Sequence, residues 1–228
     1  MESSGYGGCL EGLIFKFFKF KTELVKVVVF DYAVGNLKSI KNGLERVGAE
    51  VSITSEATEI KKADAIVLPG VGAFPEAVKR LMSEADLIKG FIANGGVLLG
   101  ICLGMQLLFT ASTEGGLYKG LDYFKGLIVK LPPNVKIPHI GWNTIKIRDY
   151  DCPILEGISD GSFLYFVHSY YAKMADVEVG SVDAETFYGT TFPSVVSKGS
   201  VFATQFHPEK SGEVGLKILK NFIEYVRR

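Results

Sequence analysis

The sequence has 228 residues, of which 47% are hydrophobic and 22% charged, and its 25 basic residues balance its 25 acidic residues. This balance predicts no nucleic-acid or anionic-membrane partner, and no apolar run reaches the roughly 18 residues that a membrane span needs. The three cysteines and three histidines are too few and too scattered for a disulfide framework or a metal site, so we expect a soluble protein of the reducing cytoplasm with no metal and no cofactor.

The first 24 residues differ from the rest of the chain. Small and polar residues come first, followed by phenylalanines interspersed with lysines, as in FKFFKFK. Lysines interrupt the apolar core that a signal peptide needs, and no small-residue cleavage site follows. We interpret residues 1–24 as an N-terminal extension that is non-native, disordered or an added edge strand, and residues 25–228 as one domain.

Strands and helices alternate from residue 25 to about residue 110. Short apolar or β-branched runs predict strands at residues 25–30, 51–54, 65–69 and 97–101. Apolar residues at helical spacing predict helices at residues 37–47, from Pro75 onward, at 88–93 and at 103–109. This order of elements predicts a central, mostly parallel sheet flanked by helices.

After about residue 120 the pattern changes to short β-rich runs. Polar residues and glycines separate FKGLIVKL, NTIKI, SFLYFVHSYYAKM, VEVGSV, FPSVVSKG and VFATQF. These runs predict a mixed or antiparallel β-rich section, and residues 213–226 predict an amphipathic helix that closes the chain.

Cys102 lies between the predicted strand 97–101 and the predicted helix 103–109, within GICLG. A G-x-C-x-G frame at a strand-to-helix turn is the cysteine form of the nucleophile elbow. Gly100 and Gly104 remove side chains that would clash in so tight a turn. The alternative is a small buried core residue, because most free cysteines are of that kind. We interpret Cys102 as a candidate nucleophile.

A glycine turn is expected beside this cysteine. Asp31, Pro69-Gly70 and Cys102 each follow a predicted strand, so parallel strands would bring all three to one edge of the sheet. The sequence PGVGAF at residues 69–74 could offer backbone N–H groups to a substrate there. It could also be no more than a tight strand-to-helix turn.

A cysteine nucleophile needs a base, and His139, His168 and His207 are the candidates. His207 differs from the other two because Glu209 follows it by two residues. An extended chain places such residues on one side, and Pro208 between them favours that geometry. Glu209 could then hold the tautomer of His207. The alternative is a solvated loop histidine beside an unrelated acid.

The sequence GICLGMQ, followed about a hundred residues later by HPE, resembles the class I, triad-type glutamine amidotransferases. This resemblance implies a flavodoxin-like sheet with Cys102 as nucleophile, His207 as general base and acid, and Glu209 as the group that orients His207. It also implies that glutamine is hydrolysed through a γ-glutamyl thioester to glutamate and ammonia.

Five longer stretches narrow the resemblance. DYAVGNLKSI, PGVGAFPEA, PHIGWN, YFVHSYY and HPEKS are together similar to the glutaminase subunits of imidazole glycerol phosphate synthase, in histidine biosynthesis. The similarity runs from about Val27 to the C-terminus. It implies L-glutamine as substrate and a heterodimer with a (β/α)8 cyclase. The cyclase would receive the ammonia and make imidazole glycerol phosphate and the aminoimidazole carboxamide ribonucleotide.

The same resemblance implies three further groups of residues. The backbone N–H groups that bind the oxyanion belong to Val71 and Leu103. The residues that bind the substrate are Gly70, Gly72, Gln106, Ser169 and Tyr170. The residues at or near the partner interface are Asn36, Trp142, Tyr165 and Lys210.

Three alternatives stay open at this point. The first is an amidotransferase subunit of another pathway, such as guanylate, anthranilate or aminodeoxychorismate synthesis. The second is a stand-alone cysteine hydrolase of similar fold, and the third is a non-catalytic interaction protein that kept the fold. Glutaminase activity, measured with and without a cyclase partner, distinguishes them.

Overall fold

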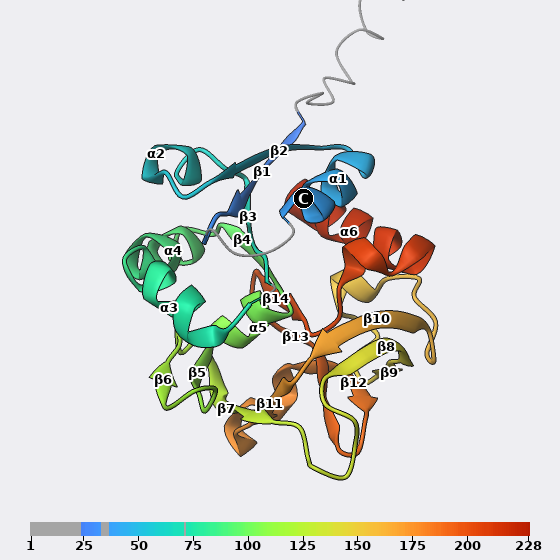
Figure 1. The fold of residues 1–228 in the computed structure, drawn as a ribbon. Helices are drawn as coiled ribbons and strands as arrows, with labels where there is room; N and C mark the ends of the chain where they lie inside the picture. The colour runs from blue at the N-terminus through green and yellow to red at the C-terminus, as the bar shows by residue number, and fades with distance from the viewer. Residues whose placement is uncertain (1–23, 33–36, 71) are drawn as a thin grey trace, which may run out of the picture.

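The structure of the protein is a computed structural model, which describes residues 24–32, 37–70 and 72–228, apart from the side chains of residues 177–179. A mixed sheet of eight strands forms its centre, in the order β2-β1-β3-β4-β14-β13-β12-β9 (Figure 1). Its strands are β1 (Val25–Phe30), β2 (Ala49–Thr54), β3 (Ala65–Leu68), β4 (Val97–Ile101), β9 (Lys146–Ile147), β12 (Val182–Phe187), β13 (Thr191–Lys198) and β14 (Val201–Thr204).

The central sheet has a parallel part and an antiparallel part. Strands β2, β1, β3, β4 and β14 run parallel to one another. Strands β13, β12 and β9 then pair antiparallel in turn. The expected mostly parallel sheet with an antiparallel C-terminal section is therefore confirmed.

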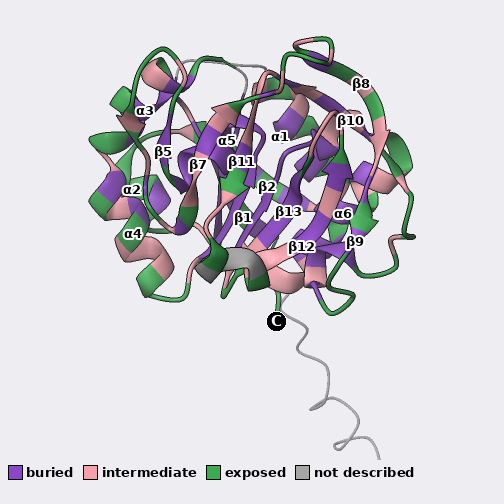
Figure 2. Ribbon diagram, turned by 90° about the horizontal axis from the view of Figure 1, so that it is seen from below, coloured by how far each residue is buried: buried purple, intermediate pink, exposed green. Residues whose placement is uncertain are grey.

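Both faces of the central sheet are buried, because side chains of each strand alternate between two apolar clusters. On β1, Val25, Val27 and Val29 belong to one cluster, whereas Val28 and Phe30 belong to the other. Helices α1 and α6 cover the first face, and α3, α4 and α5 cover the second (Figures 1 and 2). The helices are α1 (Leu37–Arg46), α2 (Ala57–Ile60), α3 (Phe74–Met82), α4 (Ala85–Ala93), α5 (Leu103–Leu107) and α6 (Gly212–Val226).

Two smaller sheets lie beside the central one. The first pairs β8 (His139–Thr144) with β10 (Phe163–His168), and the second has the order β11-β7-β5-β6. The strands of the second sheet are β5 (Phe109–Ser112), β6 (Tyr118–Lys119), β7 (Phe124–Lys130) and β11 (Tyr170–Met174). The chain passes from one small sheet to the other at a bend at Ser169, between β10 and β11.

The helix predicted at residues 103–109 is shorter than expected. It ends at Leu107, and Phe109 already begins β5. The N–H group of Leu121 donates to the Leu107 carbonyl at 2.8 Å, and that of Tyr123 donates to the Leu108 carbonyl at 2.8 Å. These long-range partners take the carbonyls that a longer helix would use, so pairing with the second small sheet overrides the local apolar pattern.

The prediction of a strand for VEVGSV was also wrong. Residues Asp176–Ser181 form the 3-10 helix η3, and β12 begins only at Val182. The 3-10 helices η2 (Pro153–Leu155) and η4 (Pro208–Lys210) each have a proline in the first turn. Proline is favoured at such starts because it lacks the N–H that would be left unpaired.

The start of the chain adds little to the described structure. Of the proposed extension at residues 1–24, only Leu24 lies within the described residues, and its side chain is exposed. No helix in the described part of the chain combines the length and hydropathy needed to cross a lipid bilayer.

Asp183 is a buried carboxylate on β12 that should make stability depend on pH. Ser197 donates a hydrogen bond to its Oδ1 atom at 3.0 Å, but burial raises its pKa from 3.8 to about 6. Because the folded-state pKa is the higher one, the free energy of unfolding should fall by roughly 2–3 kcal/mol as the pH rises between about 4 and 6, and stay lower above.

We expect Asp183→Asn to remove this fall. The variant should then be more stable than the wild type near neutral pH and gain nothing at about pH 4. Urea unfolding of both proteins at the two pH values measures the effect. If both proteins lose the same stability on going to neutral pH, another group is responsible.

Candidate active site

Cys102 occupies the turn between β4 and α5 in a strained backbone conformation. Its φ is 52° and its ψ is −103°, values that a side-chain-bearing residue adopts at a cost of about 1–3 kcal/mol. The Cys102 N–H donates to the Thr204 carbonyl of the neighbouring strand β14 at 2.7 Å. The Cys102 side chain is 5% exposed, and its thiol lies 3.7 Å from the Val167 carbonyl. The predicted elbow is therefore present.

Two glycines let the neighbouring backbone come close to this turn. A Cβ at Gly104 would lie 1.9 Å from the Leu68 carbonyl oxygen at the end of β3. A Cβ at Gly70 would lie 2.3 Å from the Leu103 Cβ and 2.6 Å from the Leu103 nitrogen. Only glycine fits at either position, so Gly70, after β3, is packed directly against the start of α5.

His207 and Glu209 form a buried pair just after β14. The Nδ1 atom of His207 lies 2.8 Å from Oε1 of Glu209, and the two side chains are 1% and 2% exposed. The Nε2 atom of His207 and the Oε2 atom of Glu209 are buried with no hydrogen-bond partner among the described residues. The pair therefore has one free ring nitrogen available for chemistry.

The surroundings of His207 favour its charged form. Burial alone would lower the pKa of His207, but the Cys102 sulphur and the Glu209 carboxylate outweigh burial and raise that pKa to about 10. Cys102 acts through its charge, and Glu209 acts through its charge and its hydrogen bond to Nδ1. Cys102 and His207 follow the neighbouring parallel strands β4 and β14, so both lie at the same edge of the sheet.

Ser211 fixes the backbone of His207 against β10. Its hydroxyl donates to the His207 carbonyl at 2.6 Å and accepts the Tyr165 N–H at 2.9 Å. The His207 N–H donates in turn to the Tyr165 carbonyl at 2.9 Å. The backbone of His207 is thus held by strand β10.

Gln205 is a buried polar residue that the sequence analysis did not single out. Its Nε2 atom lies 3.5 Å from the Cys102 sulphur, and its side chain is fully buried. Its Oε1 atom accepts a hydrogen bond at 3.2 Å from Gln106, which also donates to the Tyr170 carbonyl at 2.9 Å. A polar side chain inside the apolar run VFATQF was the available signal.

A cavity of 280 Å³ opens in front of Cys102. The residues that line it are Gly72, Cys102, Leu103, Gln106, Glu114, Pro138, Val167, His168, Ser169 and Tyr170. Six of the predicted site residues are among them, namely Gly72, Cys102, Leu103, Gln106, Ser169 and Tyr170. Val71 lies outside the described residues.

Glu114 is a further lining residue that the sequence analysis missed. It follows β5, and its Oε2 atom accepts the Phe74 N–H at the start of α3 at 3.1 Å. Burial raises its pKa, and the Phe74 N–H partly opposes that rise. Of the described residues that line the cavity, Glu114 alone carries a carboxylate. Its loop sequence STEGG gave no signal of such a role.

The predicted interface residues gather on the open face of the β8-β10 sheet. The rings of Trp142 and Tyr165 lie 6.0 Å apart, and Lys210 Nζ lies 6.0 Å from the centre of the Tyr165 ring. Ile140, Trp142 and Phe163 are 60%, 55% and 61% exposed. We call the exposed surface formed by Ile140, Trp142, Phe163, Tyr165 and Lys210 the β8-β10 face. Asn36 lies outside the described residues.

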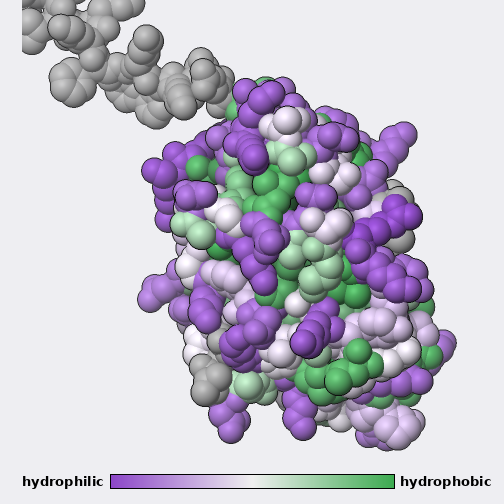
Figure 3. Space-filling view, turned by 90° about the vertical axis from the view of Figure 1, so that its left-hand side faces the viewer, coloured by the Kyte–Doolittle hydropathy of each residue, from purple (hydrophilic) through white to green (hydrophobic). Residues whose placement is uncertain are grey.

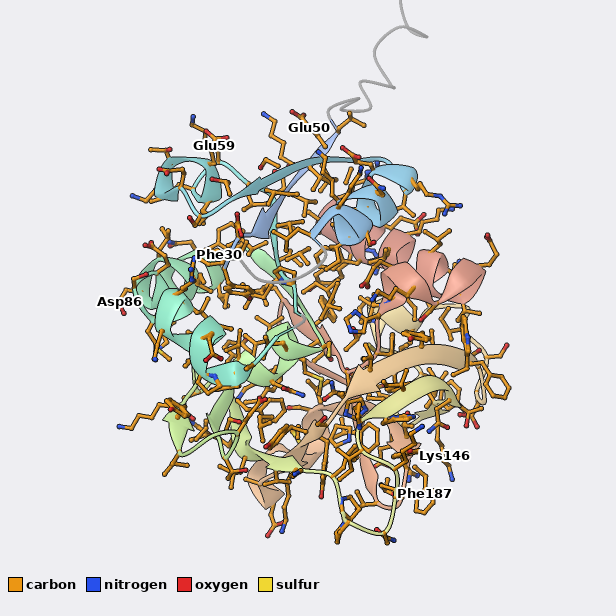
Figure 4. All side chains as sticks on the ribbon, in the orientation of Figure 1. Phe30, Glu50, Glu59, Asp86, Lys146 and Phe187 are labelled. Carbon is orange, nitrogen blue, oxygen red and sulfur yellow. The ribbon has the colours of Figure 1, made fainter. Side chains whose placement is uncertain are left out.

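A larger hollow of 640 Å³ lies away from this chemistry, between α2 and α4. Ile60, Leu87 and Phe91 supply its apolar lining, and Figure 3, which faces this side, shows apolar patches among hydrophilic side chains. Asp86 points outward from α4 at its margin (Figure 4). Among the described residues, no group of three or more His, Cys, Asp and Glu is placed to hold a metal ion, here or elsewhere.

Comparisons with known proteins agree with this geometry. Residues 28–225 match the family described as glutamine amidotransferase class-I. The chain is 51% identical over 203 residues to imidazole glycerol phosphate synthase subunit HisH of Archaeoglobus fulgidus, covering 89% of this chain and 100% of that one. It is also 51% identical to the subunit of that name from Caldanaerobacter subterraneus, over 87% of this chain and 98% of that one.

Solved structures share the fold at lower identity. PurLQS from Thermotoga maritima has a TM-score of 0.71 at 19% identity, covering 89% of this chain and 99% of that one. The glutaminase domain of CTPS from Trypanosoma brucei, solved with bound acivicin, has a TM-score of 0.65 at 14% identity, covering 89% and 93%.

Proposed function

This chain belongs to the glutamine amidotransferase class-I family, and from that premise we propose that it works as the glutaminase subunit of imidazole glycerol phosphate synthase. It is an enzyme of histidine biosynthesis that hydrolyses L-glutamine to glutamate and ammonia. The observation that carries this proposal is the buried Cys102–His207–Glu209 group at the carboxyl edge of the sheet, in a chain 51% identical to subunits of that name.

The reaction begins at the Cys102 thiolate. The raised pKa of His207 keeps its imidazole protonated at neutral pH, so that it can give a proton to the leaving group. The sulphur attacks the carboxamide carbon of glutamine and a tetrahedral oxyanion forms. The carbon–nitrogen bond then breaks, and ammonia leaves with a proton from His207 Nε2. His207, now neutral, takes a proton from water as the water attacks the thioester, which releases glutamate and restores the thiolate beside the protonated imidazole.

The oxyanion needs N–H donors, and the elbow can supply one of them. Leu103 lies at the start of α5 and lines the cavity, so we assign its N–H as a donor. We assign the second donor to the N–H of Val71, as the resemblance to the amidotransferases implies. Loss of one such donor typically costs ~3 kcal/mol of transition-state stabilisation.

The cavity also offers partners for the amino-acid end of glutamine. The carboxylate of Glu114 can form an ion pair with the α-ammonium group of glutamine. Both N–H bonds of Gln106 are engaged by Tyr170 and Gln205, which leaves its amide oxygen to accept a bond from the same ammonium. The backbone at Ser169 and Tyr170 forms the wall beside them. We assign these residues to substrate binding.

The β8-β10 face is the surface that we assign to a (β/α)8 cyclase subunit in a heterodimer. Exposed Ile140, Trp142 and Phe163 give it the large apolar side chains that protein interfaces bury, and Lys210 adds a positive charge. It lies on the strand pair whose residues Val167 and His168 line the cavity. The free thiols of Cys102 and Cys152 suit a reducing compartment such as the cytoplasm.

We expect Trp142→Ala to weaken assembly with the cyclase by ~10- to 100-fold, because exposed tryptophans at interface centres often contribute about 2 kcal/mol or more to binding. Titration of the variant with cyclase, followed by glutamate release, measures this change. Met82→Ala removes an exposed apolar residue at the end of α3 and serves as control. If Trp142→Ala and Met82→Ala bind the cyclase with equal affinity, the interface is on another surface.

The proposed function is tested by measuring glutamate release from the isolated chain and from the chain with its cyclase and the cyclase's ribonucleotide ligand. We expect weak activity alone and strong activation in the complex, because released ammonia is otherwise wasted. Equal rates with and without the partner would favour a stand-alone cysteine hydrolase instead.

A further inference from the structure

A chain of buried hydrogen bonds joins the cavity to strand β8. The carbonyl of Tyr170 accepts a hydrogen bond from Nδ1 of His168 at 2.9 Å. The Nε2 atom of His168 lies 3.0 Å from Nδ1 of His139, its cross-strand neighbour on β8. The Nε2 atom of His139 lies 3.4 Å from the amide nitrogen of Asn143, which also donates to the Phe187 carbonyl at 3.0 Å.

The direction of every bond in this chain follows from its first acceptor. A carbonyl oxygen can only accept, so Nδ1 of His168 carries a proton, and in a neutral imidazole Nε2 then accepts. His139 must therefore donate from Nδ1, and its Nε2 accepts from Asn143. Both tautomers are fixed, and no donor faces a donor.

Burial keeps both histidines neutral. His139 and His168 are 3% and 6% exposed. Burial lowers the pKa of His139 to about 4. Burial is also the main cause that lowers the pKa of His168 to about 3, although the hydrogen bond to the Tyr170 carbonyl acts to raise that pKa. His139 is also stacked between Phe166, with ring centres 5.0 Å apart, and Tyr188, with ring centres 3.9 Å apart.

The two ends of the chain meet the two functional surfaces. At one end, the His168–Tyr170 bond spans the bend at Ser169, so it closes the corner between β10 and β11 that lines the cavity. Gln106 holds the same Tyr170 carbonyl from α5. At the other end, His139 lies on the buried side of β8. Ile140 and Trp142 lie on the opposite side of the same strand and are exposed on the β8-β10 face. The Phe187 carbonyl, which accepts the hydrogen bond from the Asn143 amide, lies at the end of β12 (Figure 4).

We propose that His168 and His139 are positioning residues for the glutamine site, because their tautomer-fixed hydrogen bonds hold the Ser169–Tyr170 corner in place from the docking strand β8. Neither histidine acts as the base, since neither is paired with a carboxylate as His207 is. The role of the pair is to hold the wall that receives the amino-acid end of glutamine. This inference rests on the proposed function.

The test compares two replacements of His139 in the complex with the cyclase. His139→Phe keeps the stacking on Phe166 and Tyr188 but leaves Nε2 of His168 without a donor in a buried site. His139→Asn places an amide N–H near the position of Nδ1 and can restore the bond. We expect His139→Phe to raise the KM for glutamine about tenfold or more with kcat within about threefold, and His139→Asn to keep KM within about threefold of the wild type.

Alkylation of Cys102 by iodoacetamide provides the second measurement, because this small electrophile does not use the amino-acid wall. We expect the alkylation rate to be unchanged in both variants. If His139→Phe does not fold, His139→Leu replaces it with the same expected result. The inference is overturned by an unchanged KM in His139→Phe, by an equal rise in KM in both variants, or by alkylation that slows together with the rise in KM. A wild-type complex that releases no glutamate overturns the proposed function itself.

Discussion

Cys102→Ala should abolish glutamine hydrolysis, with a loss of at least ~10⁴-fold in kcat, because no thioester can form without the sulphur nucleophile. Alanine fits the elbow, since it removes only the thiol from a side chain that is 5% exposed. The fold and the docking surface should therefore survive. Synthesis of the cyclase products from added ammonia should continue at the wild-type rate in the complex. Glutamate release and ammonia-dependent synthesis are the two measurements.

Cys152→Ala is the matched control for this experiment. Cys152 is also a free, buried cysteine, but its thiol faces Asp183, and burial raises its pKa well above the ordinary value. We expect its loss to affect stability and to leave glutaminase activity within about threefold of the wild type. Glutamine-dependent turnover near the wild-type rate in Cys102→Ala would remove this residue from its assigned role.

Glu209→Gln should lower kcat by ~10²- to 10⁴-fold while leaving the fold intact. The carboxylate accepts from Nδ1 of His207 at 2.8 Å, and this bond keeps Nε2 directed toward the cysteine. An amide at this place can present its own N–H to Nδ1 and so favour the wrong tautomer, the effect known from the aspartate of serine proteases. Steady-state glutaminase kinetics of the complex measure the loss.

A second consequence of Glu209→Gln concerns the charge of His207. Glu209 helps to raise the pKa of His207, so its replacement should lower that pKa, which a pH titration of the imidazole by NMR detects. Glu213→Gln, at the exposed start of α6, is the control of equal charge change. If kcat and the His207 pKa respond alike in both variants, the effect is one of net charge rather than of the buried bond.

The parts of the site that the sequence predicted are those formed by residues close together in the chain. The elbow at Cys102 follows from two glycines and a strand-to-helix change within five residues, and the His207–Glu209 pair follows from a two-residue spacing. Parallel neighbouring strands then bring both to one edge of the sheet. The fold class was predictable for the same reason, because alternation of strands and helices is visible along the chain.

The parts that were missed depend on contacts between distant segments. Glu114 enters the cavity because its loop is fixed to the start of α3, and the bond between His139 and His168 exists only once β8 pairs with β10. The end of α5 at Leu107 is likewise decided by N–H groups from residues 121–124. No local pattern carries such information, since the partners are specified by the pairing of strands rather than by neighbours in sequence.

The position of β14 beside β4 determines when the active site can form during synthesis of the chain. The nucleophile lies after β4 in the first half of the sequence, whereas the base and its carboxylate follow β14, close to the C-terminus. A growing chain thus carries its thiol from residue 102 to residue 207 with no His207 imidazole to pair with it. Glutamine hydrolysis can begin only after β14 has entered the middle of the sheet, so unfinished chains on the ribosome release no ammonia. Premature termination before residue 201 should leave a polypeptide without glutaminase activity.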